Sequence, residues 1–145
     1  MTGITPAPVG ASRFATSQHK MSVIVGLVGR NSGTMTLSVS ENGMRYLAGL
    51  LIGEEPEAIT EEAVDGMMEL GNMVAGCIKE SLLKTHYEVV SISLPSLIVG
   101  NSFNVMYARG MATVSVQFEL DAFGVMEVHD RFFTCTVSLL RGSGM

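Results

Sequence analysis

A long segment with helical hydrophobic spacing, residues 61–84, constrains this chain more than any other feature of its sequence. Thr60 is a good N-cap residue, and the two glutamates that follow it suit the positive end of a helix macrodipole. On a helical wheel one side is apolar and must face a core; it consists of Val64, Met67, Leu70, Gly71, Val74, Ile78 and Leu82. We therefore expect a helix to about Thr85 that packs on an apolar surface formed by the rest of the chain.

Strand-like segments surround this helix and predict that surface. Residues 21–28 are rich in β-forming side chains, residues 29–33 are a turn cluster, and residues 34–40 alternate apolar and hydroxyl side chains. This order predicts a hairpin with one buried face. Residues 111–120 alternate most regularly, and three further segments are strand-like: residues 88–99, 103–107 and 125–140, the last as two strands or as one with a bulge.

A short helix is expected between the hairpin and the long helix. Ser40 or Asn42 can cap its start, and Gly53 can end it. Its apolar residues, at helical spacing, are Met44, Leu47, Ala48 and Leu51.

The predicted fold class is α+β, in two layers. A mostly antiparallel sheet carries two main helices, one short and one long, on one face. The length of 145 residues suits one domain. We expect an N-terminal arm with a possible first strand over residues 1–20, a single domain over residues 21–141, and a flexible tail over residues 142–145.

Composition excludes several classes of protein. Hydrophobic residues make up 47% of the chain and mean hydropathy is +0.36, unlike a disordered chain. The net charge of −5 leaves no basic surface for nucleic acid. Residues 89–108 carry no charge, but Pro95, Asn101 and several serines interrupt them, so we expect no membrane span. Without an apolar signal segment at the N-terminus, the expected location is the cytoplasm.

The two cysteines, Cys77 and Cys135, are in apolar contexts and lack metal-ligand spacing. We expect both to be buried, reduced thiols. The three histidines are scattered, so no metal site is predicted. The glycines of residues 26–33 faintly resemble a phosphate loop, but no lysine or helix follows them, so a hairpin turn is the better interpretation.

The polar side of the long helix has an unusual content. Asp65, Glu69, Asn72, Gly76 and Lys79 fall within an arc of about 80°. Most such faces are merely solvated, but here a carboxylate and a carboxamide are neighbours on one ridge. A glycine inside a helix costs about 1 kcal/mol relative to alanine, so Gly76 indicates close approach by another chain. Two flexible methionines, Met68 and Met73, flank this ridge and suit an adaptable docking surface.

The spacing Asp65-x3-Glu69-x2-Asn72 resembles the signature helix of the CheC/CheX/FliY family. Residues 51–55 and 93–100 also resemble the segments that flank this helix in the family, and the resemblance covers roughly residues 22–140. Only one such helix is present, which places the chain nearer to CheX than to the two-site CheC branch. It departs from the family in lacking a predicted N-terminal helix and in having a cysteine at residue 77, where many relatives carry a polar residue.

The resemblance implies a phosphatase that acts on the aspartyl phosphate of a CheY-like receiver in chemotaxis or two-component signalling. Asn72 would orient the hydrolytic water and Glu69 would accept a hydrogen bond from a receiver lysine, while Asp65 tunes docking. Residues 68, 73, 76 and 79 of the same helix would contact the partner. The resemblance also implies a homodimer and no cofactor in this chain, since the receiver supplies its own Mg²⁺.

Two other functions stay open from the residues. A non-catalytic adaptor could bind a receiver or the flagellar switch through the same helix face. An enzyme that works alone on a small ligand is the other, but no nucleophile, base or metal set supports it.

Overall fold

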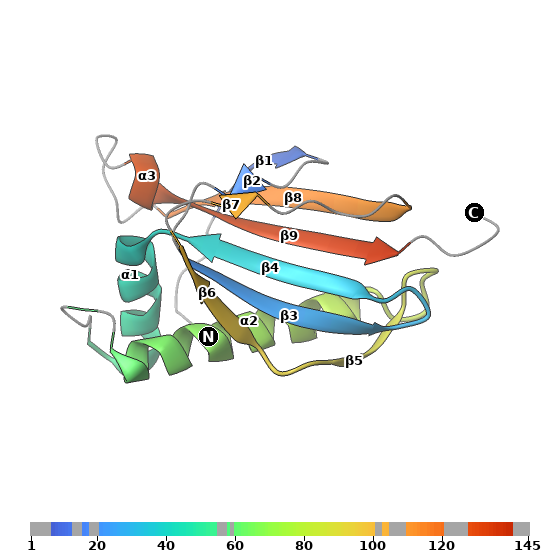
Figure 1. The fold of residues 1–145 in the computed structure, drawn as a ribbon, viewed down its shortest axis with the longest axis horizontal. Coiled ribbons are helices and arrows are strands. Elements are labelled where there is room, and N and C mark those ends of the chain that lie inside the picture. Colours follow the sequence, from blue (N-terminus) through green and yellow to red (C-terminus); the bar gives the residue numbers. More distant parts are fainter. Residues whose placement is uncertain are drawn as a thin grey trace.

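An antiparallel sheet with helices on one face is the architecture of the computed structural model (Figure 1). The structure describes residues 7–12, 16–17, 21–54, 58, 60–100, 103–104, 110–120 and 128–140. This confirms the predicted fold class: two main helices pack on one face of an antiparallel sheet. Within the described residues, no helix combines the length and apolar character needed to cross a bilayer.

The sheet has seven strands among the described residues, in the order β1-β8-β9-β4-β3-β5, with β6 also paired to β3. These strands are β1 (Ala7–Ser12), β3 (Met21–Gly29), β4 (Gly33–Val39), β5 (Val89–Ile92), β6 (Ser96–Val99), β8 (Met111–Glu119) and β9 (Phe132–Leu140). A separate two-stranded pair consists of β2 (Thr16–Ser17) and β7 (Phe103–Asn104). The tail at residues 142–145 and the rest of the predicted strand 103–107 lie outside the described residues.

The predicted hairpin is confirmed as β3 and β4, which pair from Met21↔Val39 to Leu27↔Gly33. Two other predictions about strands were wrong. Residues 88–99 form two strands, β5 and β6, with an interruption between them. The strand expected from residue 125 begins only at Phe132, because Val128–Arg131 forms a helical turn, α3.

The two main helices are α1 (Glu41–Ile52) and α2 (Glu61–Ser81). Ser40 caps α1, since its hydroxyl accepts a hydrogen bond from the Gly43 amide at 3.0 Å, and Gly53 ends the helix in the left-handed conformation. The Ser40 hydroxyl also donates to Asp130 at 2.7 Å, which ties the start of α1 to α3. Because α2 ends at Ser81, the sequence prediction overran it by about one turn.

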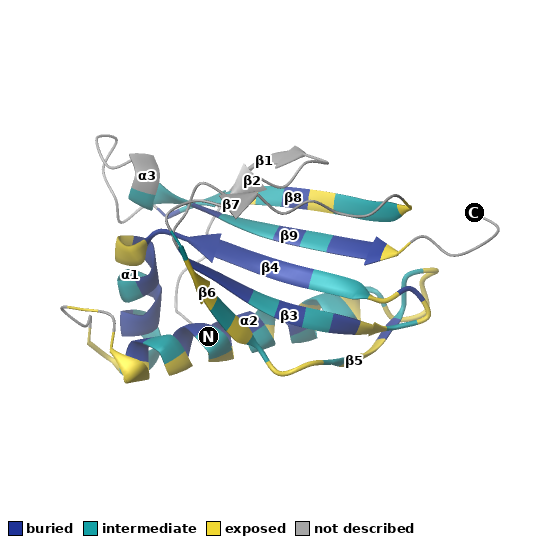
Figure 2. Cartoon of the chain, in the orientation of Figure 1, coloured by how far each residue is buried: buried dark blue, intermediate teal, exposed yellow. Residues whose placement is uncertain are grey.

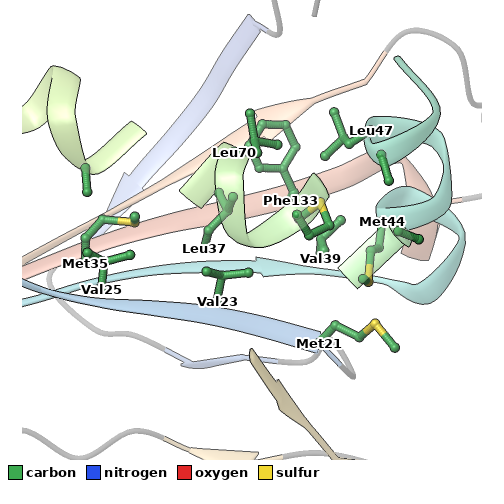
Figure 3. Close-up of a cluster of buried hydrophobic side chains, with 14 of the residues drawn as sticks. Met21, Val23, Val25, Met35, Leu37, Val39, Met44, Leu47, Leu70 and Phe133 are labelled. Carbon is green, nitrogen blue, oxygen red and sulfur yellow. The ribbon is translucent and has the colours of Figure 1, made fainter. Parts of the chain in front are cut away.

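The core lies between the sheet and the two helices (Figure 3). Alternate residues of β3 and β4 point into it, as the two-residue period of a strand requires. Buried side chains from the helices meet them; these are Met44, Leu47 and Ala48 from α1 and Ala63, Met67, Leu70 and Ala75 from α2. The expected core residues Val64, Val74, Ile78 and Leu82 are half-buried and pack around this centre.

The opposite face of the sheet is built from small hydroxyl side chains. Three cross-strand pairs, each 2.8 Å between the two oxygens, join Ser22 to Ser38, Thr113 to Ser138, and Ser115 to Thr136. Hydroxyl groups that pair in this way can be shielded from water without an unmet hydrogen bond. The polar half of the predicted alternation is therefore an ordered layer of the sheet.

Two glycines of α2 have opposite surroundings. A Cβ added at Gly71 would lie 2.6 Å from Cγ1 of Val23 on β3, so only hydrogen fits where the helix crosses the sheet. A Cβ added at Gly76 would meet nothing within 4 Å. Packing against Val23 thus explains why residue 71 is a glycine. No contact within the described residues requires a glycine at residue 76.

The two cysteines differ from each other, and the prediction that Cys77 is buried was wrong. Cys77 lies three turns beyond Gly66 on the same flank of α2, but α1 covers only the N-terminal part of that flank (Figure 1). Cys135 is half-buried on β9, and desolvation by burial raises the pKa of its thiol to about 11.

We predict that Gly71→Ala lowers the free energy of unfolding by about 1–3 kcal/mol, because the added methyl group overpacks the contact with Val23. Gly76→Ala is the matched control and should raise it by up to about 1 kcal/mol through helix propensity. Urea denaturation of the two variants measures both values. Equal effects of the two substitutions would contradict this account of the helix–sheet contact.

We also predict that a thiol reagent modifies one cysteine per native chain rapidly and the second only after unfolding. At pH 9 a thiol with a pKa of about 11 is only about one per cent thiolate, and thiolate is the reactive form. Absorbance of the released reagent measures the two phases, and Cys77→Ser should remove the rapid one. Rapid modification that persists in this variant would show that Cys135 is accessible.

Candidate functional site

The local sequence fixes where α2 begins, and so which residues share each flank. Thr60 is the predicted N-cap, and its side-chain oxygen accepts a hydrogen bond from the Ala63 amide at 3.1 Å. Each later residue then lies about 100° further around the helix. The signature residues Asp65, Glu69 and Asn72 therefore follow one another at intervals of about one turn on the same side.

Packing fixes how this helix is rotated. Gly71 touches β3, and Gly66 faces α1, where its Cβ position is 3.7 Å from Cβ of Ala48. Asn72 follows Gly71 by 100°, on the side of the helix away from Gly66. The Asn72 flank therefore faces away from α1, toward the edge of the sheet formed by β5 and β6.

We call the seven predicted site residues on this helix the α2 ridge. The two carboxylate residues Asp65 and Glu69 are exposed, and so is Met73. The other members of the α2 ridge are half-buried; these are Met68, Asn72, Gly76 and Lys79. Thus α2 brings all seven onto one accessible surface, although Asn72 and Lys79 lie lower on the flank than a fully outward-facing residue would.

Within the described residues, the charged side chains of the α2 ridge have no ion-pair partner. Asp65, Glu69 and Lys79 form no ion pair within the described part of the chain, whereas Arg131 and Glu119 pair with each other elsewhere. The acidic residues lie toward the N-terminal end, and Lys79 lies about 15 Å further along the helix from Glu69. An acidic end and a basic end suit a partner with the opposite arrangement of charge.

Asn72 has the most unusual environment in the site. Its carboxamide oxygen, Oδ1, is buried and has no hydrogen-bond partner, the one such side-chain atom among the described residues. A buried acceptor without a donor costs about 1–3 kcal/mol in lost hydration. Asn72, whose oxygen carries this cost, is also the residue that the sequence resemblance identifies as the candidate catalytic group.

Other candidate chemistry finds no support in the described residues. They contain no group of three or more His, Cys, Asp or Glu residues that could hold a metal ion. Gly29 and Gly33 of the loop that resembles a phosphate site are required by packing, because added Cβ atoms would collide with the carbonyl oxygens of Glu88 and Ser138.

The sequence-based prediction missed one feature of this surface. The edge next to the α2 ridge is interrupted at Ser93–Pro95, where Leu94 projects outward. The proline within an otherwise strand-like run was the available signal, since proline inside a strand pattern argues for an edge or a bulge.

Comparison with known proteins identifies relatives of this arrangement. A family model described as chemotaxis phosphatase CheX matches residues 21–119. Among curated proteins, none matches the sequence.

Three solved structures are similar in fold. The CheX proteins of Desulfovibrio desulfuricans and Vibrio vulnificus are each 19% identical to this chain, with TM-scores of 0.75 and 0.76; each match covers 96% of this chain and 88% of the other. A CheX–CheY–BeF3–Mg²⁺ complex from Borrelia burgdorferi is 19% identical over 94% of this chain and 84% of that one, with a TM-score of 0.72. At this level of identity, the likeness concerns the fold.

We predict that Asn72→Ala raises the free energy of unfolding by about 1 kcal/mol, because it removes an unsatisfied oxygen and improves helix propensity. Glu69→Ala, at an exposed residue of the same ridge, is the control and should change it by less than about 0.5 kcal/mol. Urea unfolding measures both. A clear loss of stability in Asn72→Ala would mean that the amide makes a stabilising contact.

Proposed function

This chain belongs to the CheX family, and from that premise we propose that it accelerates hydrolysis of the aspartyl phosphate on a CheY-like receiver domain. The observation that carries the proposal is the placement of Asn72 between the exposed residues Glu69 and Met73 of α2, half-buried and with a carboxamide oxygen that has no hydrogen-bond partner. The Borrelia relative forms a complex with CheY, which supports a partner of the same kind for this chain.

The proposed reaction requires few chemical groups from this chain. A water oxygen attacks the phosphorus, the bond between phosphorus and the aspartate oxygen breaks, and the products are inorganic phosphate and the free carboxylate. The receiver supplies the Mg²⁺ that neutralises the developing charge, so the remaining requirement is an oriented water. We assign that task to Asn72, whose Oδ1 accepts a hydrogen bond from the water while its amide nitrogen donates to a neighbouring oxygen.

The half-burial of Asn72 is compatible with this task. To reach a partner the side chain must turn outward, and Oδ1 breaks no hydrogen bond when it does so. A rotation of this kind is fast for a partly exposed side chain. The receiver site then offers Oδ1 the donor that the isolated chain lacks.

The rest of the α2 ridge has roles in docking. Glu69, exposed and one turn before Asn72, accepts from a lysine beside the phosphoryl group, while Asp65 tunes docking one turn earlier. The open space at Gly76 lets the partner's backbone approach closely, and Met68 and Met73 adapt to its surface. Lys79 meets negative charge on the partner.

Asn72→Ala should abolish stimulated loss of phosphate from a receiver phosphorylated with acetyl phosphate, a reduction of about 10²–10³-fold, because the water loses its orienting group. Binding to the receiver should change little, since Glu69 and Lys79 remain. Glu62→Ala, an exposed residue in the first turn of α2, is the matched control and should keep full activity.

Turnover separates this function from the adaptor alternative. A catalyst present at one tenth of the receiver concentration shortens the phosphate lifetime of the whole pool, whereas an adaptor affects at most its own equivalent. Unchanged hydrolysis rates with Asn72→Ala would rule out the proposed mechanism.

A further inference from the structure

The glycine at residue 76 lowers the stability of α2 without a packing reason among the described residues. A Cβ added at Gly76 would meet nothing within 4 Å, so even the side chain of Lys79, one turn later, leaves this space open. A glycine inside a helix is less stable than an alanine at the same position. The close contact with Val23 compensates for this cost at Gly71, but no such contact does so at Gly76.

Gly76 is the neighbour of Asn72 on the C-terminal side of the same flank. Four residues separate the two, so they lie about 40° apart around the helix and about 6 Å apart along it. Both residues are half-buried. Along α2, exposed and half-buried residues recur between the buried ones, as expected for a helix that covers one face of a sheet (Figure 2).

A side chain at residue 76 would cover the surface beside Asn72. In an α-helix the bond from Cα to Cβ tilts toward the N-terminus, so each side chain lies over the turn that precedes it. The turn before residue 76 is the one that contains Asn72. Because residue 76 is a glycine, the surface on the C-terminal side of the Asn72 amide stays uncovered.

Asn72 needs this uncovered surface if it acts on a partner. Its Oδ1 is buried without a hydrogen-bond partner, so the amide has to meet a donor that comes from outside the described part of the chain. On its N-terminal side the helix carries the longer side chains of Met68 and Glu69. The glycine side therefore offers the least obstructed approach to the amide.

We propose that Gly76 determines whether a receiver can reach Asn72, because its missing side chain leaves room for the receiver directly beside the amide. This inference rests on the proposed function and adds a residue that selects the partner. The receiver segment that lies over residue 76 has to present backbone or a small side chain, since the free space there is that of a missing side chain. Substitution of Gly76 should then stabilise the helix and weaken the interaction at the same time.

The test compares Gly76→Ala and Gly76→Met with Cys77→Met. Cys77 is exposed and lies about 140° around the helix from Asn72, so its substitution adds the same side chain on another flank. Urea unfolding measures stability, and affinity is measured to a receiver loaded with beryllofluoride and Mg²⁺. Hydrolysis is measured with a receiver phosphorylated by acetyl phosphate.

In Gly76→Met we expect a higher urea midpoint, because the helix loses a glycine. We also expect the dissociation constant for the receiver to rise about tenfold, as for an overpacked contact, and kcat/KM to fall by at least the same factor. Gly76→Ala should shift all three values in the same directions by smaller amounts. Cys77→Met should keep the wild-type affinity and rate.

Several outcomes would overturn the inference or the function separately. Unchanged affinity and rate in Gly76→Met overturn the role of Gly76, and so does an equal loss in Cys77→Met. A loss of stability that accompanies the loss of affinity also overturns it, since residue 76 would then act through the fold of α2. A wild-type chain that binds the receiver without speeding phosphate loss overturns the proposed function alone, because the affinity of Gly76→Met still decides the role of Gly76. A wild-type chain that does not bind the receiver overturns both.

Discussion

The contact of Gly71 with Val23 is the constraint on which the rest of the site depends. It lets the backbone of α2 approach β3 closely, and the contact of Gly66 with Ala48 on α1 fixes the rotation of the same helix. Distance and rotation together decide which flank is buried and which is accessible. A helix held farther from the sheet, or turned by one residue, would place a different side chain where Asn72 now lies. The position of the candidate catalytic group is therefore set by two glycines that take no part in chemistry.

Much of the fold could be predicted because its signals are local. The β3–β4 hairpin follows from alternation and a turn cluster, and both helix starts follow from capping side chains at Ser40 and Thr60. Features that depend on distant parts of the chain could not be predicted this way. The exposure of Cys77 depends on how far α1 extends over α2, and the break at Ser93–Pro95 depends on what pairs with Gly26.

The candidate site likewise combines features that the sequence predicts with features that depend on packing. Sequence placed Asp65, Glu69 and Asn72 on one side of a helix, since helical spacing is sufficient for that. Their burial differs, because it depends on packing: the carboxylates are exposed, while Asn72 is half-buried with an unpartnered Oδ1. A local cost of this kind persists when the surrounding structure enforces it, and such costs concentrate at functional positions. The unmet hydrogen bond of Asn72 is thus the feature of the isolated chain that a partner would relieve.

The proposed chemistry explains why such a small group of residues can be enough. When the receiver brings the metal and the reactive phosphate, this chain has to supply one oriented amide and a means of holding it there. In the proposed complex the charges of Asp65, Glu69 and Lys79, which form no ion pair among the described residues, would act over distance and so favour one orientation and a faster encounter. Salt screens these charges, so the proposed docking would weaken as ionic strength rises. In the proposed function a receiver would have to complement these charges as well as admit the amide of Asn72, which would make recognition more selective than the single amide could be alone.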